Sequence, residues 1–552
     1  MNQNRQMAEL LFPNIKLEIK DLETRFPRRD EDSVVTRFAP SPTGFLHIGG
    51  VYTALMNRKL AAQSDKGVFM LRIEDTDKKR EVANSKGIIC NIFSRFGIKI
   101  DEGVVSEDEQ VGNYGSYIQS ERIEIYHTVA KYLVEEGYAY PCFCSEEDLN
   151  EIRAHQEANH LAPGYYREFA KYRNVSVEDA SKLLAEKGSF VLRFRVPDQI
   201  DERIAVDDLI KGHVEMENNI NDFVLLKENG IPTYHFAHCC DDHFMGTTVV
   251  MRGDEWLPSL PIHLQLFNAC GFKLPNYAHV APIMKLDGES RRKLSKRKDP
   301  ESSAEFYLEK GYPIKALFVY LYTLINSNFE EWYLANPDAD LNEFEMSFSN
   351  MSISGALYDL TKLNSISSEI IYKTSVEDNV ENVLAYAQEF DQDLYQRLTS
   401  DLALTKRLFE TQGPDSSEHR KDLNCYSDFL HVFGSLYTDI FEEGNDFYKQ
   451  MLDENLPQDI RSEVVNGYIK YFNEKANGSE LTLKDLAKEL GFTDKKKYMK
   501  NPDMYKGITT QFYKGLRLLL THQEHGISMD DVILVLGHDE VIRRLGLGLW
   551  LI

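Results

Sequence analysis

Between residues 33 and 130, short apolar runs alternate with an amphipathic segment, which is the pattern of an α/β domain. The runs from Val34 to Phe38 and from Val68 to Ile73 are short and mostly apolar, as buried parallel strands are. From about Val51, apolar residues recur at the spacing of one helix face. The pattern therefore predicts a strand, a tight turn rich in proline and glycine, a helix and a second strand.

Residues 131–225 change character and read as an insertion into that domain. Charged, helical sequence surrounds the run from Phe190 to Val196, whose alternation of apolar and polar positions predicts a strand. The α/β pattern then returns over 226–330. There the runs Pro232 to Ala237 and Val249 to Arg252 predict strands.

The returning α/β segment is completed by a helix and a loop. The helix is predicted over LPIHLQLFNAC, and the glycine- and charge-rich loop runs from Leu286 to Lys298. After about residue 331 helix follows helix, and no run there predicts a strand convincingly. The predicted division of the chain is 1–32, an N-terminal extension; 33–130 and 226–330, the two halves of the α/β domain; 131–225, the insertion; and 331–440 and 441–552, two helical domains.

The composition says more about the cellular compartment and the class of protein than about its activity. The chain has 552 residues, is 42% hydrophobic and carries a net charge of −25, so its whole surface is not a non-specific nucleic-acid binder. Local basic runs occur at 78–80, 291–298 and 495–497, each of which could equally be a solvated face. We expect no transmembrane helix and no signal peptide. Seven scattered cysteines indicate a reducing cytoplasm rather than a disulfide framework.

Two places carry candidate chemistry. The turn before the first helix ends in His47-Ile48-Gly49-Gly50, and the N–H groups of a helix start suit an anion, with His47 as a further donor. Glu74 to Asp77 follow the second predicted strand, where parallel sheets bind ligands. The alternative is that these carboxylates cap the next helix, and both readings hold if Glu74 faces a ligand and Asp77 caps.

Several motifs resemble one enzyme family. HIGG at 47–50 and KLSKR at 293–297 are similar to the two signature motifs of class I aminoacyl-tRNA synthetases. RFAPSPTGFLHIGG, LRIEDTD, PTYHFAHCCDDHFMG and MRGDEW resemble the glutamyl-tRNA synthetases of bacterial type, from about residue 33 to the end. The resemblance implies a Rossmann-like α/β catalytic domain with an α+β insertion that binds the tRNA acceptor end. An all-α anticodon-binding half follows.

The resemblance also implies a two-step ligation. The carboxylate of L-glutamate attacks the α-phosphate of ATP, which gives glutamyl-adenylate and pyrophosphate, and the 3′ end of tRNA(Glu) then takes the glutamyl group and releases AMP. Phosphoryl chemistry of this kind needs positioning and charge neutralisation. By resemblance, His47, Lys293 and Lys296 are catalytic, and the ATP-binding residues are Ser41, His47, Gly49, Gly50, Glu255, Ile283, Met284, Lys293 and Lys296.

Glutamate carries two carboxylates and an ammonium, so its pocket needs cations and an anion. By resemblance, the glutamate-binding residues are Arg37, Ser41, Glu74, Tyr234, His238, Arg252 and Trp256. Glu74 pairs with the ammonium in this interpretation. The chain departs from the family at Gly50, where many members have a second histidine, and at His238, where many have asparagine.

We predict no protein-bound metal. Cys142 and Cys144 resemble half of a zinc site found in some family members, but the other half is missing from GYYREFAKYR, and only His155 and His160 are near in sequence. The cluster from His235 to His243 is interpreted as amino-acid pocket and helix rather than a metal site. Mg²⁺ is expected to arrive with ATP.

The expected partners are L-glutamate and tRNA(Glu), and the expected protein is a cytoplasmic monomer without membrane contact. A non-discriminating enzyme that also charges tRNA(Gln) remains open. A catalytically silent RNA-binding paralogue is disfavoured by the presence of His47 and Lys296. A truncated enzyme that glutamylates a modified base is disfavoured by the long sequence after residue 330.

Overall fold

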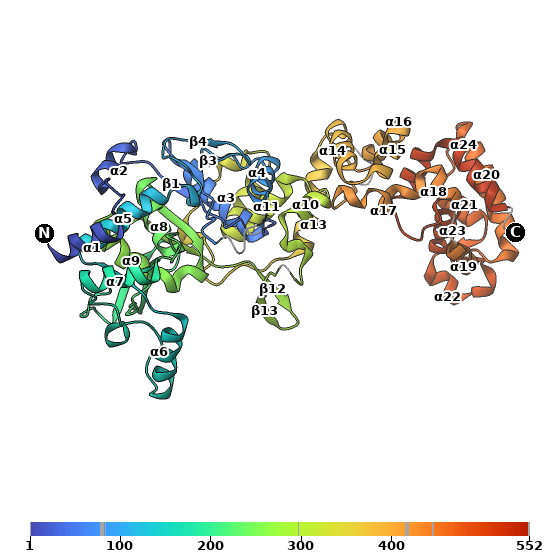
Figure 1. Ribbon diagram of the computed structural model, residues 1–552. Coiled ribbons are helices and arrows are strands. Elements are labelled where there is room, and N and C mark those ends of the chain that lie inside the picture. Colours follow the sequence, from blue (N-terminus) through green and yellow to red (C-terminus); the bar gives the residue numbers. More distant parts are fainter. Residues whose placement is uncertain are drawn as a thin grey trace. The chain divides into compact units, whose positions relative to one another are not determined.

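The computed structural model describes residues 2–42, 44–77, 82, 84–295, 297–414, 419–443 and 446–549 (Figure 1). The chain divides into two units, which are described separately. The first contains Met1–Phe306 and Leu321–Asp359, and the second contains Tyr307–Tyr320 and Leu360–Ile552. The six-part division expected from the sequence is finer than this and stays a prediction.

The first unit contains the predicted α/β domain. Strands β1 (Val35–Phe38), β2 (Val68–Leu71) and β3 (Glu102–Val104) are parallel, and β4 (Gln110–Val111) runs antiparallel beside β3. Helix α3 (Ile48–Ala62) connects β1 to β2 and packs on both. Val35 and the three apolar residues Phe69, Met70 and Leu71 are fully buried, which confirms the two strands predicted from apolar runs.

A second sheet lies beside the first; two of its strands follow the insertion in the sequence, and the other two belong to the insertion. Its order is β10 (Val249–Gly253), β11 (Asn276–Val280), β7 (Arg203–Asp208) and β8 (Gly212–Glu217). The Thr248 N–H donates to the Val35 carbonyl at 3.0 Å, and the Val35 N–H donates to the Thr248 hydroxyl at 2.8 Å. These bonds join the two halves of the domain at β1 and the start of β10.

The insertion adds its own small sheet. Strands β5 (Ala139–Cys142), β6 (Val191–Phe194) and β9 (Val224–Leu226) are antiparallel neighbours, so the strand predicted near Phe190 is confirmed. The helices of the first unit before residue 300 are α1 (Gln3–Leu11), α2 (Ile19–Arg25), α4 (Ser85–Arg95), α5 (Ile123–Glu135), α6 (Glu146–Ala158), α7 (Val177–Lys187), α8 (Tyr234–Phe244) and α9 (Leu260–Cys270). Helix α1 of the N-terminal extension packs on α5, as expected for a docked extension.

Two local predictions are wrong, and one alternative for the acidic run after β2 does not hold. The run from Pro232 to Ala237 leads into α8, which begins at Tyr234, rather than forming a strand, because the sequence continues with buried residues at helical spacing, such as Cys240 and Phe244. The predicted loop from Leu286 is largely a hairpin of β12 (Met284–Asp287) and β13 (Ser290–Lys293). Asp77 does not cap α4, whose N-cap is Asn84.

The second unit is helical. Its core is a continuous apolar cluster that includes Phe429, Tyr468 and Phe512, all fully buried. One two-residue parallel pair, β14 (Phe492–Thr493) with β15 (Gly507–Ile508), is an addition to the predicted all-helical pattern. Helices α10 (Ala304–Glu309) and α11 (Ile314–Ile325) have residues in both units, and α12 (Phe329–Ala335) belongs to the first. The further helices of the second unit are α13 (Leu360–Lys373), α14 (Val376–Phe390), α15 (Gln392–Ser400), α16 (Leu402–Glu410), α17 (Phe429–Phe433), α18 (Thr438–Glu443), α19 (Asp446–Asn455), α20 (Gln458–Ala476), α21 (Leu483–Glu489), α22 (Lys495–Lys500), α23 (Thr509–Thr521) and α24 (Met529–Leu549).

Candidate active site

The carboxyl ends of β1, β2, β10 and β11 surround a cavity of about 630 Å³ in the first unit. Ligands bind at this edge of open α/β sheets, so the location agrees with the sequence-based expectation. The cavity is lined by twelve of the residues predicted from the sequence: Arg37, Ser41, His47, Gly49, Gly50, Glu74, Tyr234, Arg252, Glu255, Trp256, Ile283 and Lys293.

Three predicted residues are not among those that line it. His238 is fully buried behind Tyr234, whose ring it stacks on at a centroid distance of 5.8 Å. Met284 follows the lining residue Ile283 and pairs with Lys293 in the β12–β13 hairpin. Lys296 lies outside the described residues.

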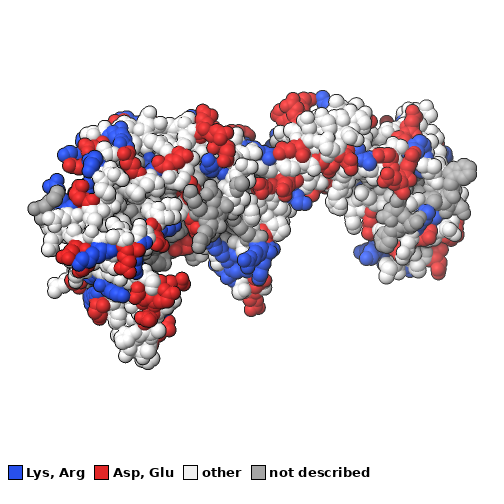
Figure 2. Space-filling model, viewed as in Figure 1, with Lys and Arg blue, Asp and Glu red and all other residues white. Residues whose placement is uncertain are grey.

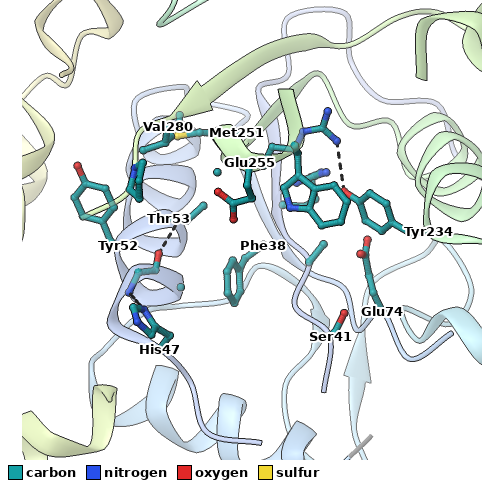
Figure 3. A pocket seen from close by; sticks show the side chains of 18 of the residues that line it. Phe38, Ser41, His47, Tyr52, Thr53, Glu74, Tyr234, Met251, Glu255 and Val280 are labelled. Carbon is teal, nitrogen blue, oxygen red and sulfur yellow. Dashed lines mark hydrogen bonds between the residues drawn. The ribbon is translucent and has the colours of Figure 1, made fainter. Parts of the chain in front are cut away.

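The two ends of the cavity differ in chemistry (Figure 3). Ser41, Glu74 and Tyr234 lie at one end, and His47 and Tyr52 lie at the other, beside the start of α3. Because these groups come from strand ends, from helix starts and from the η3 turn (Asp254–Ser259), they meet only when both halves of the domain are in place.

His47 is the N-cap of α3. Its Nδ1 accepts the Gly49 N–H at 2.9 Å, and the Gly50 N–H donates to the His47 carbonyl at 2.7 Å. Both glycine N–H groups are thus hydrogen-bonded within the turn, and their role toward an anion stays a prediction. The neutral ring carries its proton on Nε2 because Nδ1 accepts. A Cβ at Gly50 would lie 2.9 Å from Leu46 Cδ1, so a larger residue there needs Leu46 to move.

Buried charges stabilise the other end. Asp242 on α8 accepts from Arg37 Nε at 3.2 Å and from Arg72 Nη1 at 2.7 Å, and it contacts His238 Nδ1 at 2.7 Å. Burial alone would raise the pKa of Asp242, but the two guanidinium groups hold that pKa well below its usual range. Burial also lowers the pKa of His238 to about 3, so its ring is neutral and donates to Asp242.

Glu74 is the carboxylate at this end that lines the cavity. Its carboxylate accepts from Arg72 Nη2 at 3.1 Å. Burial raises its pKa to about 6, against the opposing effect of Arg72 and Arg37. The neighbouring Asp75 is occupied elsewhere, since it accepts from the Ser120 N–H at 2.8 Å and from the Ser120 hydroxyl at 2.5 Å.

An aromatic and cationic wall completes the cavity. Arg252, at the end of β10, donates from Nη1 to the Tyr234 hydroxyl at 3.4 Å, and the Tyr234 ring lies on Trp256 with centroids 4.2 Å apart. Lys227 also lines the cavity and donates to the Thr76 carbonyl at 2.9 Å. Sequence reasoning missed Lys227, although its place directly after a short apolar strand was a usable signal.

Basic side chains gather on the β12–β13 hairpin (Figure 2), and one of them, Lys293, lines this cavity. Arg292 binds Asp299 with both Nη atoms, at 2.6 and 2.8 Å, and Asp299 also accepts the Ser295 N–H at 2.9 Å. Lys293 remains 57% exposed and is 3.8 Å from Glu255. The hairpin is thus fixed at its base by Asp299, while Lys293 faces the cavity, where Glu255 at 3.8 Å is its ion-pair partner among the described side chains.

The sequence segment after the lysine loop is tied to the start of α3. Ser303 forms a bridge with His47, and the Ala304 N–H donates to the Leu46 carbonyl at 2.9 Å. The two signature motifs, although far apart in sequence, therefore belong to one site through Lys293 and Ser303.

Within the described residues, no three His, Cys, Asp or Glu side chains are grouped as metal ligands. Cys142 and Cys144 both lie near the Tyr165 hydroxyl, at 3.4 and 3.5 Å, and His155 and His160 are exposed. Two thiols and a phenol fall short of the four ligands of a closed structural zinc site. None of the helices in the described ranges has an apolar stretch that could span a lipid bilayer.

We predict that the purified protein contains less than one zinc per chain, because Cys142 and Cys144 lack two further ligands. Elemental analysis after dialysis without chelator measures this directly. One zinc per chain that disappears in a Cys142→Ser variant would contradict the prediction.

Comparison with known proteins gives consistent relatives. A family model described as tRNA synthetases class I (E and Q), catalytic domain, matches residues 33–353. The glutamate–tRNA ligases of Clostridium perfringens strain 13 and Acetivibrio thermocellus are each 42% identical, over 98% of this chain and 99% of theirs.

Solved structures agree with this at the level of the fold. A glutamate tRNA ligase from Elizabethkingia meningosepticum, in complex with its amino acid, matches with a TM-score of 0.72 and 27% identity, covering 94% of this chain and 99% of that one. A glutamate–tRNA synthetase from Elizabethkingia anophelis gives 0.68 and 26%, covering 94% and 100%. The fold predicted from the motifs, a class I catalytic domain followed by a helical half, is confirmed, and the chain belongs to the class I tRNA synthetases of the E and Q group.

Proposed function

We propose that this protein ligates L-glutamate to the 3′ end of tRNA(Glu), through glutamyl-adenylate, with release of pyrophosphate and AMP. The observation that carries the proposal is the pairing, in one cavity, of a buried charged end with the N-terminus of α3 and Lys293. Such a cavity has room for an amino acid at one end and a nucleotide at the other.

The charged end suits glutamate by charge count. Arg37, Arg72 and Arg252 supply three positive charges there, and Asp242 and Glu74 supply two negative ones. The neighbouring Asp241 is balanced by Arg122, and the lining residues Asp77 and Lys227 carry opposite charges. One positive charge is left over, and glutamate, with two carboxylates and one ammonium, brings a net charge of −1. We assign the carboxylates to Arg37 and Arg252, with Ser41 and Tyr234 as hydroxyl partners, and the ammonium to Glu74.

The other end suits ATP. The His47 ring donates from Nε2 at the positive end of the α3 dipole, where a phosphate is favoured. Lys293, and Lys296 beyond it in sequence, neutralise the charge that develops on the phosphates. Ile283 is buried at the cavity wall and offers an apolar contact for adenine, with Gly49, Glu255 and Trp256 nearby toward the ribose.

Adenylate formation then follows from geometry. The glutamate α-carboxylate attacks the α-phosphate in line, so the chain's task is to align the two and screen their repulsion. Mg²⁺ comes with ATP rather than through a dedicated protein cage. The helical second unit is assigned to tRNA, and a cytoplasmic, monomeric enzyme remains our proposal.

We expect Lys296→Ala to lower glutamyl-adenylate formation by about 10²-fold or more, the usual scale for a lost transition-state charge contact. The measurement is tRNA-dependent ATP–pyrophosphate exchange. Lys298→Ala is the matched control, because it removes the same charge from the same loop at a side chain whose nearest carboxylate, Asp287, is 3.8 Å away. Equal rates in the Lys296 variant and the wild type would remove Lys296 from the reaction.

We expect kcat/KM for L-glutamate to fall about tenfold per pH unit below pH 6. The pKa of Glu74 is raised to about 6, so on acidification this carboxylate loses the charge that binds the substrate ammonium earlier than an ordinary glutamate would. Exchange kinetics at saturating ATP and tRNA give the profile. Glu74→Gln should lower kcat/KM and abolish the acid limb, and an unchanged limb in that variant would assign it to another group.

The substrate range is decided by charging purified tRNA(Glu) and tRNA(Gln) side by side with the full chain and L-glutamate. We expect tRNA(Glu) to be charged to completion. Comparable charging of tRNA(Gln) would identify a non-discriminating enzyme, and failure to charge either tRNA would refute the proposed function.

A further inference from the structure

Arg252 is buried without a carboxylate partner. Its exposed fraction is 5%, and no ion pair within 4 Å is found for it among the described side chains. It donates from Nε to His279 Nε2 at 3.1 Å, from Nη2 to His263 Nδ1 at 3.1 Å and from Nη1 to the Tyr234 hydroxyl at 3.4 Å. By contrast, Arg37 and Arg72 are both paired with Asp242.

These contacts fix where the protons lie. A guanidinium only donates, so His279 must accept at Nε2 and His263 at Nδ1. Each neutral ring then carries its proton on the other nitrogen. His279 Nδ1–H donates to Asp208 Oδ2 at 2.7 Å, and His263 Nε2–H donates to His235 Nδ1 at 3.0 Å. Burial lowers the pKa of both rings, in agreement with neutral histidines beside a cation.

Asp208 lies at the end of β7, and its side-chain carboxylate accepts every hydrogen bond that it makes there. Its Oδ1 accepts the N–H groups of Ile210 and Lys211, each at 2.9 Å. Its Oδ2 accepts the backbone N–H of His279 at 3.0 Å as well as the ring proton. Because all of these neighbouring groups donate hydrogen bonds, the NH2 group of an asparagine in place of Asp208 would face a backbone N–H group that also donates. Asp208 therefore determines which tautomer His279 adopts.

We propose that Asp208, acting through His279, is a positioning residue that holds the Arg252 guanidinium in place for a substrate carboxylate. The inference rests on the proposed function. Imidazole acceptors orient Arg252 without neutralising it, whereas a carboxylate in direct contact would compete with the substrate. The three contacts use three of the five guanidinium N–H groups, which leaves two for a ligand.

The test begins with Asp208→Asn. The asparagine amide keeps more hydrogen bonds when its oxygen faces the N–H groups of Ile210 and Lys211, so its NH2 group faces His279 and favours the ring proton on Nε2, toward Arg252 Nε–H. We expect KM for L-glutamate to rise about tenfold or more, the factor that a hydrogen bond to a charged group is worth, with KM for ATP and for tRNA unchanged. Asp207→Asn is the matched control on the same strand, because the Asp207 side chain is 90% exposed and pairs with exposed His213.

Substitutions at His279 separate positioning from general stability. Glutamine has no tautomers and places an acceptor near the Nε2 position, so His279→Gln should keep KM for L-glutamate near the wild-type value. Asparagine reaches only the Nδ1 position and keeps the Asp208 contact, so His279→Asn should raise that KM. In the His279→Gln background, Asp208→Asn should add no further increase.

Two results would overturn the positioning role. One is a penalty from Asp208→Asn that is equal in the wild-type and the His279→Gln backgrounds. The other is a parallel rise of all three KM values together with a lower melting temperature, which would mean that Asp208 only stabilises the β7–β8 turn. If Asp208→Asn does not fold, the ordering of the two His279 variants decides alone. Wild-type protein that neither binds nor activates L-glutamate would instead reject the proposed function, independently of Asp208.

Discussion

The substrate end of the cavity depends on one buried carboxylate, that of Asp242. It joins Arg37 from β1, Arg72 from the end of β2 and His238 from its own helix α8. Removing such charges from water is costly, and the cost is offset only when the partners meet with good geometry. The two halves of the catalytic domain, separated by the insertion, must therefore close on each other before this end of the cavity exists.

A consequence is that the arginine-rich end of the cavity keeps a positive net charge. Asp242 and Glu74 balance two of the three arginines at this end, and the third, Arg252, is held by neutral histidines. Residues of two kinds thus prepare the site. Paired charges set its shape, and in the proposed function the one uncompensated cation, Arg252, selects an acidic substrate. At the far end, the hydrogen bond from the Gly49 N–H fixes the orientation of the His47 ring, which we propose contacts the nucleotide.

Much of this arrangement could be predicted from the sequence because its signals are local. Strands β1, β2, β6 and β10 are short apolar or alternating runs, and twelve predicted residues line one cavity because parallel strands share a carboxyl edge. Local signals failed where tertiary context decides. Pro232 to Ala237 is too short for its periodicity to tell strand from helix, and the β12–β13 hairpin has no apolar alternation.

Polar contacts between residues far apart in the sequence could not be predicted. His279 and Asp208 are 71 positions apart, and nothing in either neighbourhood predicts their hydrogen bond. His238 was expected in the pocket, but it lies behind the pocket wall. Its ring instead contacts Asp242, which lies one turn further along the same helix α8.

The central claim is that an uncompensated buried cation makes this site select a dicarboxylic amino acid. Its most direct test is the ratio of kcat/KM for L-glutamate to that for L-glutamine in tRNA-dependent pyrophosphate exchange, since the two substrates differ only in the charge of one end. The account predicts a preference for glutamate of about 10²-fold or more, the scale of a charge-assisted bidentate contact. Equal values for the two amino acids would contradict it.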